Sequence, residues 1–197
     1  MGSNSTAYTI RETAELTMAS DYSKILNVIG DNEECDFSSI HDSELSSYLE
    51  TCQTIHYIIG FTNQRLREKF DNLFKRHGGQ LRNVIHPNAF ISPSATIGYG
   101  NYIACNAIIS SRAVIGDSNL INYAVSIGHD TVVGNDCVFN PGARIGGCSC
   151  IGNRNLFGAN SFVYQGTKIC DDCRIDALVY LHKNLEEPIT IRNINRI

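Results

Sequence analysis

The sequence predicts a mainly β protein whose larger part is a parallel β-helix, and three regularities point to this fold. The first is a bulky apolar residue at every sixth position, without one insertion: Ile85, Ile91, Ile97, Ile103, Ile109, Ile115, Ile121, Ile127, Val133, Phe139, Ile145, Ile151, Phe157, Val163, Ile169, Ile175 and Leu181. In a chain with 43% hydrophobic residues, seventeen consecutive hits would arise by chance with a probability on the order of one in a million. A hexapeptide period is typical of a parallel β-helix.

The second regularity is a small or short side chain two positions before each bulky residue. These positions hold Ala89, Ala95, Asn101, Ala107, Ala113, Asn119, Val125, Thr131, Cys137, Ala143, Ser149, Asn155, Ser161, Thr167, Cys173 and Val179. Because alternate residues of a strand point to the same face, both sets should point inward. One bulky and one small inward residue per strand, on three short strands per turn, describe a narrow triangular prism.

The third regularity is a likeness between residues eighteen apart, which should stack between successive coils. One such column contains Ile85, Ile103, Ile121, Phe139, Phe157 and Ile175. Another column collects Asn101, Asn119 and Asn155, with Cys137 and Cys173 in its gaps. Asn tolerates a left-handed corner conformation and bonds neighbouring backbone, so we expect this column at one corner of the prism.

Composition limits the classes of partner. The 197 residues carry a net charge of −4 and 18% charged residues, which describes a globular chain without the basic face that nucleic-acid binding needs. The sequence has no apolar run of about 18 residues or more, and its start, "MGSNSTAYTIRETAELTM", lacks a basic and an apolar signal region. We therefore expect no nucleic-acid or membrane partner and a cytoplasmic location.

The eight cysteines are expected to be free thiols, because no signal peptide precedes them. Cys148-x-Cys150 and Cys170-x-x-Cys173 raise the hypothesis of a four-thiolate zinc site. The repeat argues against it, because it turns Cys173 inward and places Cys148 on a different corner. No metal is therefore expected.

The region before Ile85 has a different rhythm and predicts a small α/β unit. The apolar runs 24–29, "KILNVI", and 55–59, "IHYII", suggest parallel strands, and residues 63–77 suggest a helix that stops at Gly78-Gly79. Ligands of such units bind where loops leave the carboxyl ends of strands, which makes Asp31, Gly60 and Asn63 candidate substrate-binding residues. The predicted domains are 1–84 and 85–197.

Three stretches together resemble a known family. They are "IHYIIGFTNQRLREKF", "VIHPNAFISPSATIG" at the domain joint, and "VSIGHDTVVGNDCVFNPGARIGG". The chain resembles the left-handed β-helix acyltransferases, and more narrowly the nucleotide-sugar acetyltransferases related to sialic acid O-acetyltransferase and bacillosamine N-acetyltransferase, over residues 55 to about 182.

The resemblance implies different functions for the two predicted domains. Residues 1–84 would form a Rossmann-like nucleotide-sugar-binding domain, and residues 85–197 a left-handed β-helix that binds acetyl-CoA and carries the catalytic groups. The protein would be a homotrimer with acetyl-CoA bound between subunits. Two departures stand out: "AYTIRETAELTMAS" has no glycine where the family has a Gly-rich loop, and Ala177 stands where it favours glycine beside the cofactor.

His129 is the candidate general base, in the pair His129-Asp130. Acetyl transfer needs a base for the nucleophile's proton and a donor for the carbonyl oxygen as it gains charge. His129 follows inward Ile127 by two positions, which turns it outward at a corner, and Asp130 would orient the imidazole. The residue eighteen positions later is Gly147, so the next coil has no side chain above the imidazole, and space is left for a thioester.

Weaker candidates surround this pair. The Gly147 amide, next to Gly146, is the expected oxyanion donor, a role that the resemblance also implies. Ser111, one coil before His129, and Asn140, on the coil after it, are candidate substrate contacts. His86 and His182 lie at the ends of the predicted β-helix, and we expect them to be structural.

The predicted activity is acetyl-CoA-dependent N-acetylation of a nucleotide-linked amino sugar, a 4-amino-4,6-dideoxyhexose, by direct transfer. The amine preference rests on the resemblance, and O-acetylation of a sugar such as sialic acid is the near alternative. A γ-type carbonic anhydrase would need three zinc-binding histidines, and the middle of the repeat holds one. A non-enzymatic scaffold, such as an ice-binding β-helix, would show regular Thr or Ser columns, which the outward positions lack.

Overall fold

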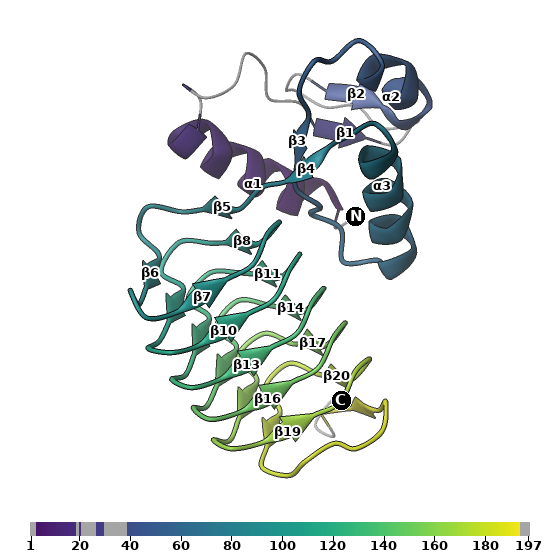
Figure 1. Ribbon diagram of the computed structural model, residues 1–197. Helices are drawn as coiled ribbons and strands as arrows, with labels where there is room; N and C mark the ends of the chain where they lie inside the picture. Colours follow the sequence, from purple (N-terminus) through teal and green to yellow (C-terminus); the bar gives the residue numbers. More distant parts are fainter. Residues whose placement is uncertain (1–2, 19, 21–26, 30–38, 194–197) are drawn as a thin grey trace. The chain divides into compact units, whose positions relative to one another are not determined.

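The computed structural model describes residues 3–18, 20, 27–29 and 39–193 (Figure 1). The chain divides into two compact units, Met1–Val84 and Ile85–Ile197, and each is described by itself. No helix among the described residues is long and apolar enough to cross a membrane.

The second unit is a parallel β-helix of three sheets, whose strands are two residues long (Figure 1). The first sheet contains β5 (Val84–Ile85), β8 (Tyr102–Ile103), β11 (Leu120–Ile121), β14 (Val138–Phe139), β17 (Leu156–Phe157), β20 (Arg174–Ile175) and β22 (Thr190–Ile191). The second contains β6 (Phe90–Ile91), β9 (Ile108–Ile109), β12 (Ser126–Ile127), β15 (Arg144–Ile145), β18 (Phe162–Val163) and β21 (Tyr180–Leu181). The third contains β7 (Thr96–Ile97), β10 (Val114–Ile115), β13 (Val132–Val133), β16 (Cys150–Ile151) and β19 (Lys168–Ile169).

Neighbouring strands pair in the register that the stacking predicts. Ile121 pairs with Phe139, Ile127 with Ile145, and Val133 with Ile151, in each case eighteen residues later and in parallel. The predicted fold class, mainly β with a left-handed parallel β-helix, is confirmed.

The repeated apolar residues fill the interior of the prism. From Ile103 to Leu181 every sixth residue is buried, and the small residues Ala107, Ala113 and Ala143 are buried between them. Phe139 and Phe157 stack with their ring centroids 4.8 Å apart and their planes 2° from parallel. A small residue just before each strand leaves room in the narrow interior for the bulky residue of that strand.

The asparagine column closes backbone hydrogen bonds inside one corner. The Asn101 carboxamide oxygen accepts the Asn119 N–H at 2.8 Å, and the Asn119 oxygen accepts the Cys137 N–H at 2.8 Å. Asn155 does the same for Cys173 at 2.7 Å. Each buried carboxamide thereby satisfies a backbone donor of the following coil, as predicted. The expected left-handed conformation lies instead at the residue before, as at Ser118 before Asn119, with φ 58°.

The corners between strands are tight turns with one residue in the left-handed region. Positive φ recurs at non-glycine residues spaced by six or twelve from Asn106 to Leu178, and Asp130 is among them with φ 59°. The coils approach so closely that a Cβ on Gly128 would lie 2.4 Å from the Gly147 nitrogen. Glycine is therefore required at position 128 by the close packing of one coil on the next.

The first unit contains three helices and four short strands in its described residues. The helices are α1 (Ser3–Met18), α2 (Asp42–Leu49) and α3 (Gln64–Arg76), and the strands are β1 (Asn27–Ile29), β2 (Ser39–His41), β3 (His56–Tyr57) and β4 (Gln80–Leu81). The predicted helix 63–77 is confirmed as α3, which ends at Arg76 before Gly78, whose φ is 74°. Ile40, Leu45, Leu49 and Phe70 form one apolar core cluster of this unit.

The strands of the first unit pair differently from a Rossmann sheet. The predicted runs 24–29 and 55–59 overlap β1 and β3, but β1 pairs in parallel with β2, and β3 with β4. Among the described residues these are two separate two-stranded sheets. A single sheet across both runs is absent from that part of the chain, so the Rossmann-like description is not borne out there.

Candidate functional site

The side chains of His129 and Asp130 meet at the corner that follows β12. The His129 Nδ1 and an Asp130 carboxylate oxygen are 2.7 Å apart, and both side chains are partly exposed. The left-handed backbone of Asp130 and the bond from its N–H to the Ser111 carbonyl, at 3.0 Å, fix this turn. The structure therefore brings together the two residues that the sequence predicted as a pair.

Arg112 holds the Asp130 carboxylate from the preceding coil. Its Nε and one terminal nitrogen donate to the two carboxylate oxygens at 2.6 and 2.7 Å, in the two-pronged geometry that matches a guanidinium to a carboxylate. The sequence interpretation missed Arg112. The signal was present in the stacking rule, because Arg112 precedes Asp130 by eighteen residues.

These contacts determine the charge of Asp130 and the tautomer of His129. Hydrogen bonds from Arg112, and next from His129, lower the pKa of Asp130 to about 2. An ionised carboxylate can only accept hydrogen bonds, so the His129 Nδ1 must carry the proton that it shares with Asp130. In the neutral ring the Nε2 lone pair is then free to accept a proton from a substrate.

Gly147 lies directly against the His129 imidazole. A Cβ added to Gly147 would be 2.8 Å from Nε2, 2.9 Å from Cε1 and 3.0 Å from Cδ2. The sequence interpretation treated this position as space left for a thioester. A side chain at residue 147 would collide with the ring, so the absence of a side chain there is what lets the imidazole take this position.

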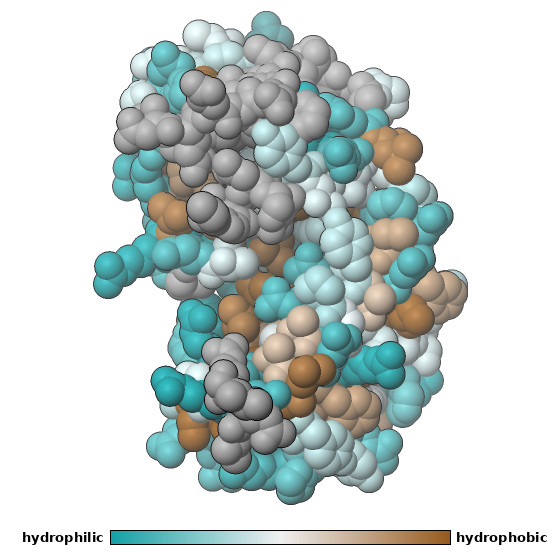
Figure 2. Space-filling model, turned by 180° about the vertical axis from the view of Figure 1, so that it is seen from behind, coloured by the Kyte–Doolittle hydropathy of each residue, from teal (hydrophilic) through white to brown (hydrophobic). Residues whose placement is uncertain are grey.

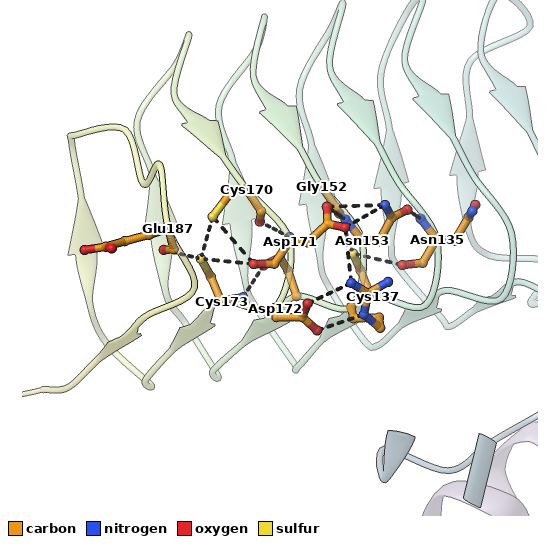
Figure 3. Close-up of polar contacts among 11 residues, drawn as sticks. Asn135, Cys137, Gly152, Asn153, Cys170, Asp171, Asp172, Cys173 and Glu187 are labelled. Atoms are coloured by element: carbon orange, nitrogen blue, oxygen red, sulfur yellow. Dashed lines mark hydrogen bonds and ion pairs between the residues drawn. The ribbon is translucent and has the colours of Figure 1, made fainter. Parts of the chain in front are cut away.

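The amides of Gly146 and Gly147 differ in availability. The Gly146 N–H donates to the Val163 carbonyl at 2.9 Å, whereas the Gly147 N–H has no acceptor among the described residues. A different corner shows why. There the N–H groups of Asn135 and Asn153 bond the side chains eighteen residues later, Asn153 and Asp171, each at 2.8 Å (Figure 3). At the corner of His129, no side chain from the next coil accepts the Gly147 N–H, so this donor is available to a ligand.

Three other candidates occupy defined places in the β-helix. Ser111 shares the corner of His129, one coil earlier, and its carbonyl accepts the Asp130 N–H. Asn140 and Ala177 lie at a different corner, after β14 and β20. The Asn140 carboxamide donates to the Phe157 carbonyl at 3.1 Å, and the Ala177 carbonyl accepts from Asn193 at 3.1 Å. Within one chain these two residues do not join the His129 corner.

The candidates in the first unit have structural contacts. The Asn63 side chain accepts the N–H groups of Arg65 and Leu66, at 3.0 and 3.3 Å, and so caps the N-terminus of α3. A Cβ on Gly60 would lie 2.8 Å from Ile10 Cδ1. Asp31 lies outside the described residues.

One group of three potential metal ligands occurs in the described part of the chain. It consists of His129, Asp130 and Cys148, whose ligand atoms all lie within 4.8 Å of one another. Both Asp130 oxygens already bind Arg112, and a cation would have to displace this guanidinium. The donor set therefore suits an acid–base pair better than a metal. The four cysteines of the zinc hypothesis do not come together as a group of three or more in the described part of the chain.

Comparisons with known proteins support the fold and the family resemblance. No family model and no curated protein matches the chain. PerB from Caulobacter crescentus, solved with CoA and GDP-perosamine, is 25% identical with a TM-score of 0.83, over 95% of this chain and 90% of that one.

Two further solved structures are comparably similar. GDP-perosamine N-acetyltransferase from Caulobacter crescentus, as a variant with CoA and GDP-perosamine, is 24% identical with a TM-score of 0.85, over 98% of this chain and 92% of that one. The acetyltransferase domain of PglB from Neisseria gonorrhoeae, with acetyl coenzyme A, is 22% identical with a TM-score of 0.83, over 96% and 92%. The predicted resemblance to left-handed β-helix acetyltransferases is thereby confirmed.

The Arg112–Asp130 contact predicts how the Asp130 carboxylate titrates. Carbon-detected NMR should find its pKa at about 2, and Arg112→Gln should move it toward the ordinary value of about 4, because the main stabiliser of the anion is lost. The pairing stabilises the fold fully above the ordinary pKa, and this contribution disappears as the pH falls through the lowered pKa.

Arg154→Gln is the matched control, because Arg154 binds Asp171 and Asp172 in the same manner at another corner. It should leave the titration of Asp130 unchanged. A wild-type Asp130 that titrates at the ordinary value would contradict the assigned geometry.

Proposed function

We propose that this protein is an acetyl-CoA-dependent N-acetyltransferase that acts on the amino group of a nucleotide-linked amino sugar. The observation that carries the proposal is the corner of His129. There an ionised Asp130 holds the Nδ1–H, Nε2 is left as a base, and the Gly147 N–H has no partner among the described residues. These are the two functions, base and oxyanion donor, that acyl transfer requires.

The reaction follows from these two groups. The sugar amine attacks the thioester carbonyl carbon while Nε2 of His129 removes a proton from the amine. Asp130 stabilises the imidazolium that forms, and the Gly147 N–H donates to the carbonyl oxygen as it becomes negative. When the carbonyl re-forms, the carbon–sulfur bond breaks, and the imidazolium returns its proton to the departing thiolate of coenzyme A. The products are the N-acetyl sugar and free coenzyme A.

The comparisons favour an amine as the acceptor. Two of the similar structures contain GDP-perosamine, whose sugar is an amino sugar, and one of them is called an N-acetyltransferase. We therefore propose a nucleotide-linked 4-amino-4,6-dideoxyhexose as the acceptor. O-acetylation of a hydroxyl, as on sialic acid, uses the same base and is the second candidate. An acceptor panel containing amines and hydroxyls distinguishes them.

The remaining candidates would bind the two substrates. We assign Gly146 and Ala177 to the path of acetyl-CoA, Ser111 and Asn140 to the acceptor sugar, and the first unit, through Asp31, Gly60 and Asn63, to the nucleotide. Asn63 already caps α3 through its oxygen, so its contribution would come from the amide nitrogen.

A homotrimer would complete this site. Asn140 and Ala177 lie at a different corner of the prism from His129, and a substrate that contacts both corners needs a neighbouring subunit. Outward side chains suit such contacts, because Phe90, Ile108 and Phe162 project exposed from the strands of one sheet. Figure 2 shows one face of the molecule, on which apolar residues lie among polar ones.

We place the enzyme in the cytoplasm, where acetyl-CoA and nucleotide sugars are available.

Loss of the base should lower turnover without loss of the fold. With acetyl-CoA and nucleotide amino sugars, His129→Ala should reduce kcat by about 10²- to 10⁴-fold, followed as release of free thiol. His182→Ala is the matched control, an exposed histidine at the end of the β-helix, and should retain activity. Near-normal turnover by the His129 variant would refute its role. No turnover by wild type on any acceptor would favour the scaffold alternative.

The contact between Gly147 and the imidazole predicts a second effect. Gly147→Ala should reduce kcat about 10²-fold, because its Cβ would displace a ring that now lies 2.8 Å from that position. Gly166→Asn is the control on the next coil, where an added Cβ meets no atom within 4 Å and Asn tolerates the local φ of 74°. Equal activity of the two variants would contradict the packing argument.

A further inference from the structure

Cys170 and Cys173 flank the corner turn that follows β19, and their sulfurs are 3.6 Å apart (Figure 3). Asp171 and Asp172 form the turn between them, and Asp172 has φ 62°. The first and fourth residues of a tight turn have Cα atoms less than about 7 Å apart, which is close to the span that a disulfide bridges. By contrast, the exposed cysteines 148 and 150 have no sulfur–sulfur contact in the described part of the chain.

Cys170 replaces a glycine at the point where regular stacking ends. The same corner holds Gly116, Gly134 and Gly152 in earlier coils, and a Cβ on Gly152 would lie 2.4 Å from an Asp171 oxygen. After Cys170 the chain no longer adds a coil of this form, because Ile169 bridges to Leu185, sixteen residues on. Without a following coil in register, a side chain fits at this corner.

Cys173 ends the asparagine column. Its N–H donates to the Asn155 carboxamide oxygen at 2.7 Å. Its thiol stands where Asn101 and Asn119 carry a carboxamide that accepts a backbone N–H of the next coil. The Cys173 thiol contacts the carbonyl oxygens of Asp171 and Glu187 at 3.8 and 3.6 Å instead. The glycine column thus holds a cysteine first in this coil, beside the second cysteine of the asparagine column, which follows Cys137.

The two thiols differ in access. Cys170 is half-buried and Cys173 is buried, and burial raises the pKa of the Cys173 thiol to about 11. Two carboxylates flank the pair, and Arg154 balances them through Asp171 at 3.2 Å and Asp172 at 2.7 Å. A reagent can therefore reach the Cys170 sulfur first. The buried Cys173 sulfur lies 3.6 Å from it, within reach for a second step.

We propose that Cys170 and Cys173 form a thiol modification site that reacts with low-molecular-weight disulfides. The Cys170 thiolate attacks one sulfur of the reagent disulfide, and the other half leaves as a thiolate. The Cys173 thiol then attacks the Cys170 sulfur of the mixed disulfide and breaks its bond to the second half, which leaves as a thiolate and takes up the Cys173 proton. The protein gains one intramolecular disulfide, and one reagent disulfide is reduced to two thiols.

The bond would tie the terminal corner turn to the core. The Cys170 N–H donates to the Leu185 carbonyl at 2.9 Å, and the Cys173 thiol contacts Glu187, so both partners touch the segment that follows β21. The proposal does not depend on the acetyltransferase activity.

Treatment of the native protein with oxidised glutathione tests this site. After excess reagent is removed, the protein is unfolded, alkylated and mapped by mass spectrometry. The expected result is a peptide with a Cys170–Cys173 disulfide, lighter by two hydrogen atoms and restored by dithiothreitol. Cys173→Ser should trap glutathione on Cys170, and Cys170→Ser should leave Cys173 unmodified.

The double variant Cys148→Ser/Cys150→Ser is the matched control and should form the same disulfide in the same yield. Circular dichroism of each variant before treatment verifies that it is folded, and the wild-type map alone is decisive. Alkylated Cys170 and Cys173 alongside glutathione on Cys148 or Cys150 would overturn the proposal.

Discussion

The parallel stacking of residues eighteen apart is the constraint on which the rest of the structure depends. Ile127 pairs with Ile145, and in this register each corner of one coil lies directly against the equivalent corner of the next coil. It brings Gly147 against His129, Arg112 to Asp130, and Asn101 to Asn119. The candidate site is thus a consequence of the repeat, because exposed side chains at a corner have as neighbours the residues one coil away.

Stacking also explains how a partly exposed pair becomes ordered. A surface ion pair contributes little by itself, because solvent screens it and two side chains lose freedom. Here Arg112 meets Asp130 from a rigid coil, and the backbone of Asp130 is fixed by its turn. The carboxylate stays ionised and directs the proton of His129 to Nδ1. The Arg112–Asp130 pair therefore matters for the orientation of the imidazole more than for stability.

Much of this was predictable from the sequence, because the β-helix repeats one local rule. The inward residues, the asparagine column and the approach of Gly147 to His129 all follow from counting in eighteens. Arg112 was missed because residues eighteen apart were compared by size and not by opposite charge, which would have paired Arg112 with Asp130. The pairing of β1 with β2 and of β3 with β4 was not predictable, because short apolar runs do not specify their partners. The local role of Asn63 as a cap was likewise hidden by its place in a loop.

The central claim is that the His129 corner directs an acetyl group from acetyl-CoA to a sugar amine. The most direct measurement uses acetyl-CoA with a ¹³C-labelled acetyl group and a mixture of nucleotide-linked amino sugars and hydroxyl acceptors, with the product identified by mass spectrometry and NMR. The account predicts labelled acetyl on the amino nitrogen of one nucleotide sugar. Label on a hydroxyl alone, or on no acceptor while acetyl-CoA stays intact, would contradict it.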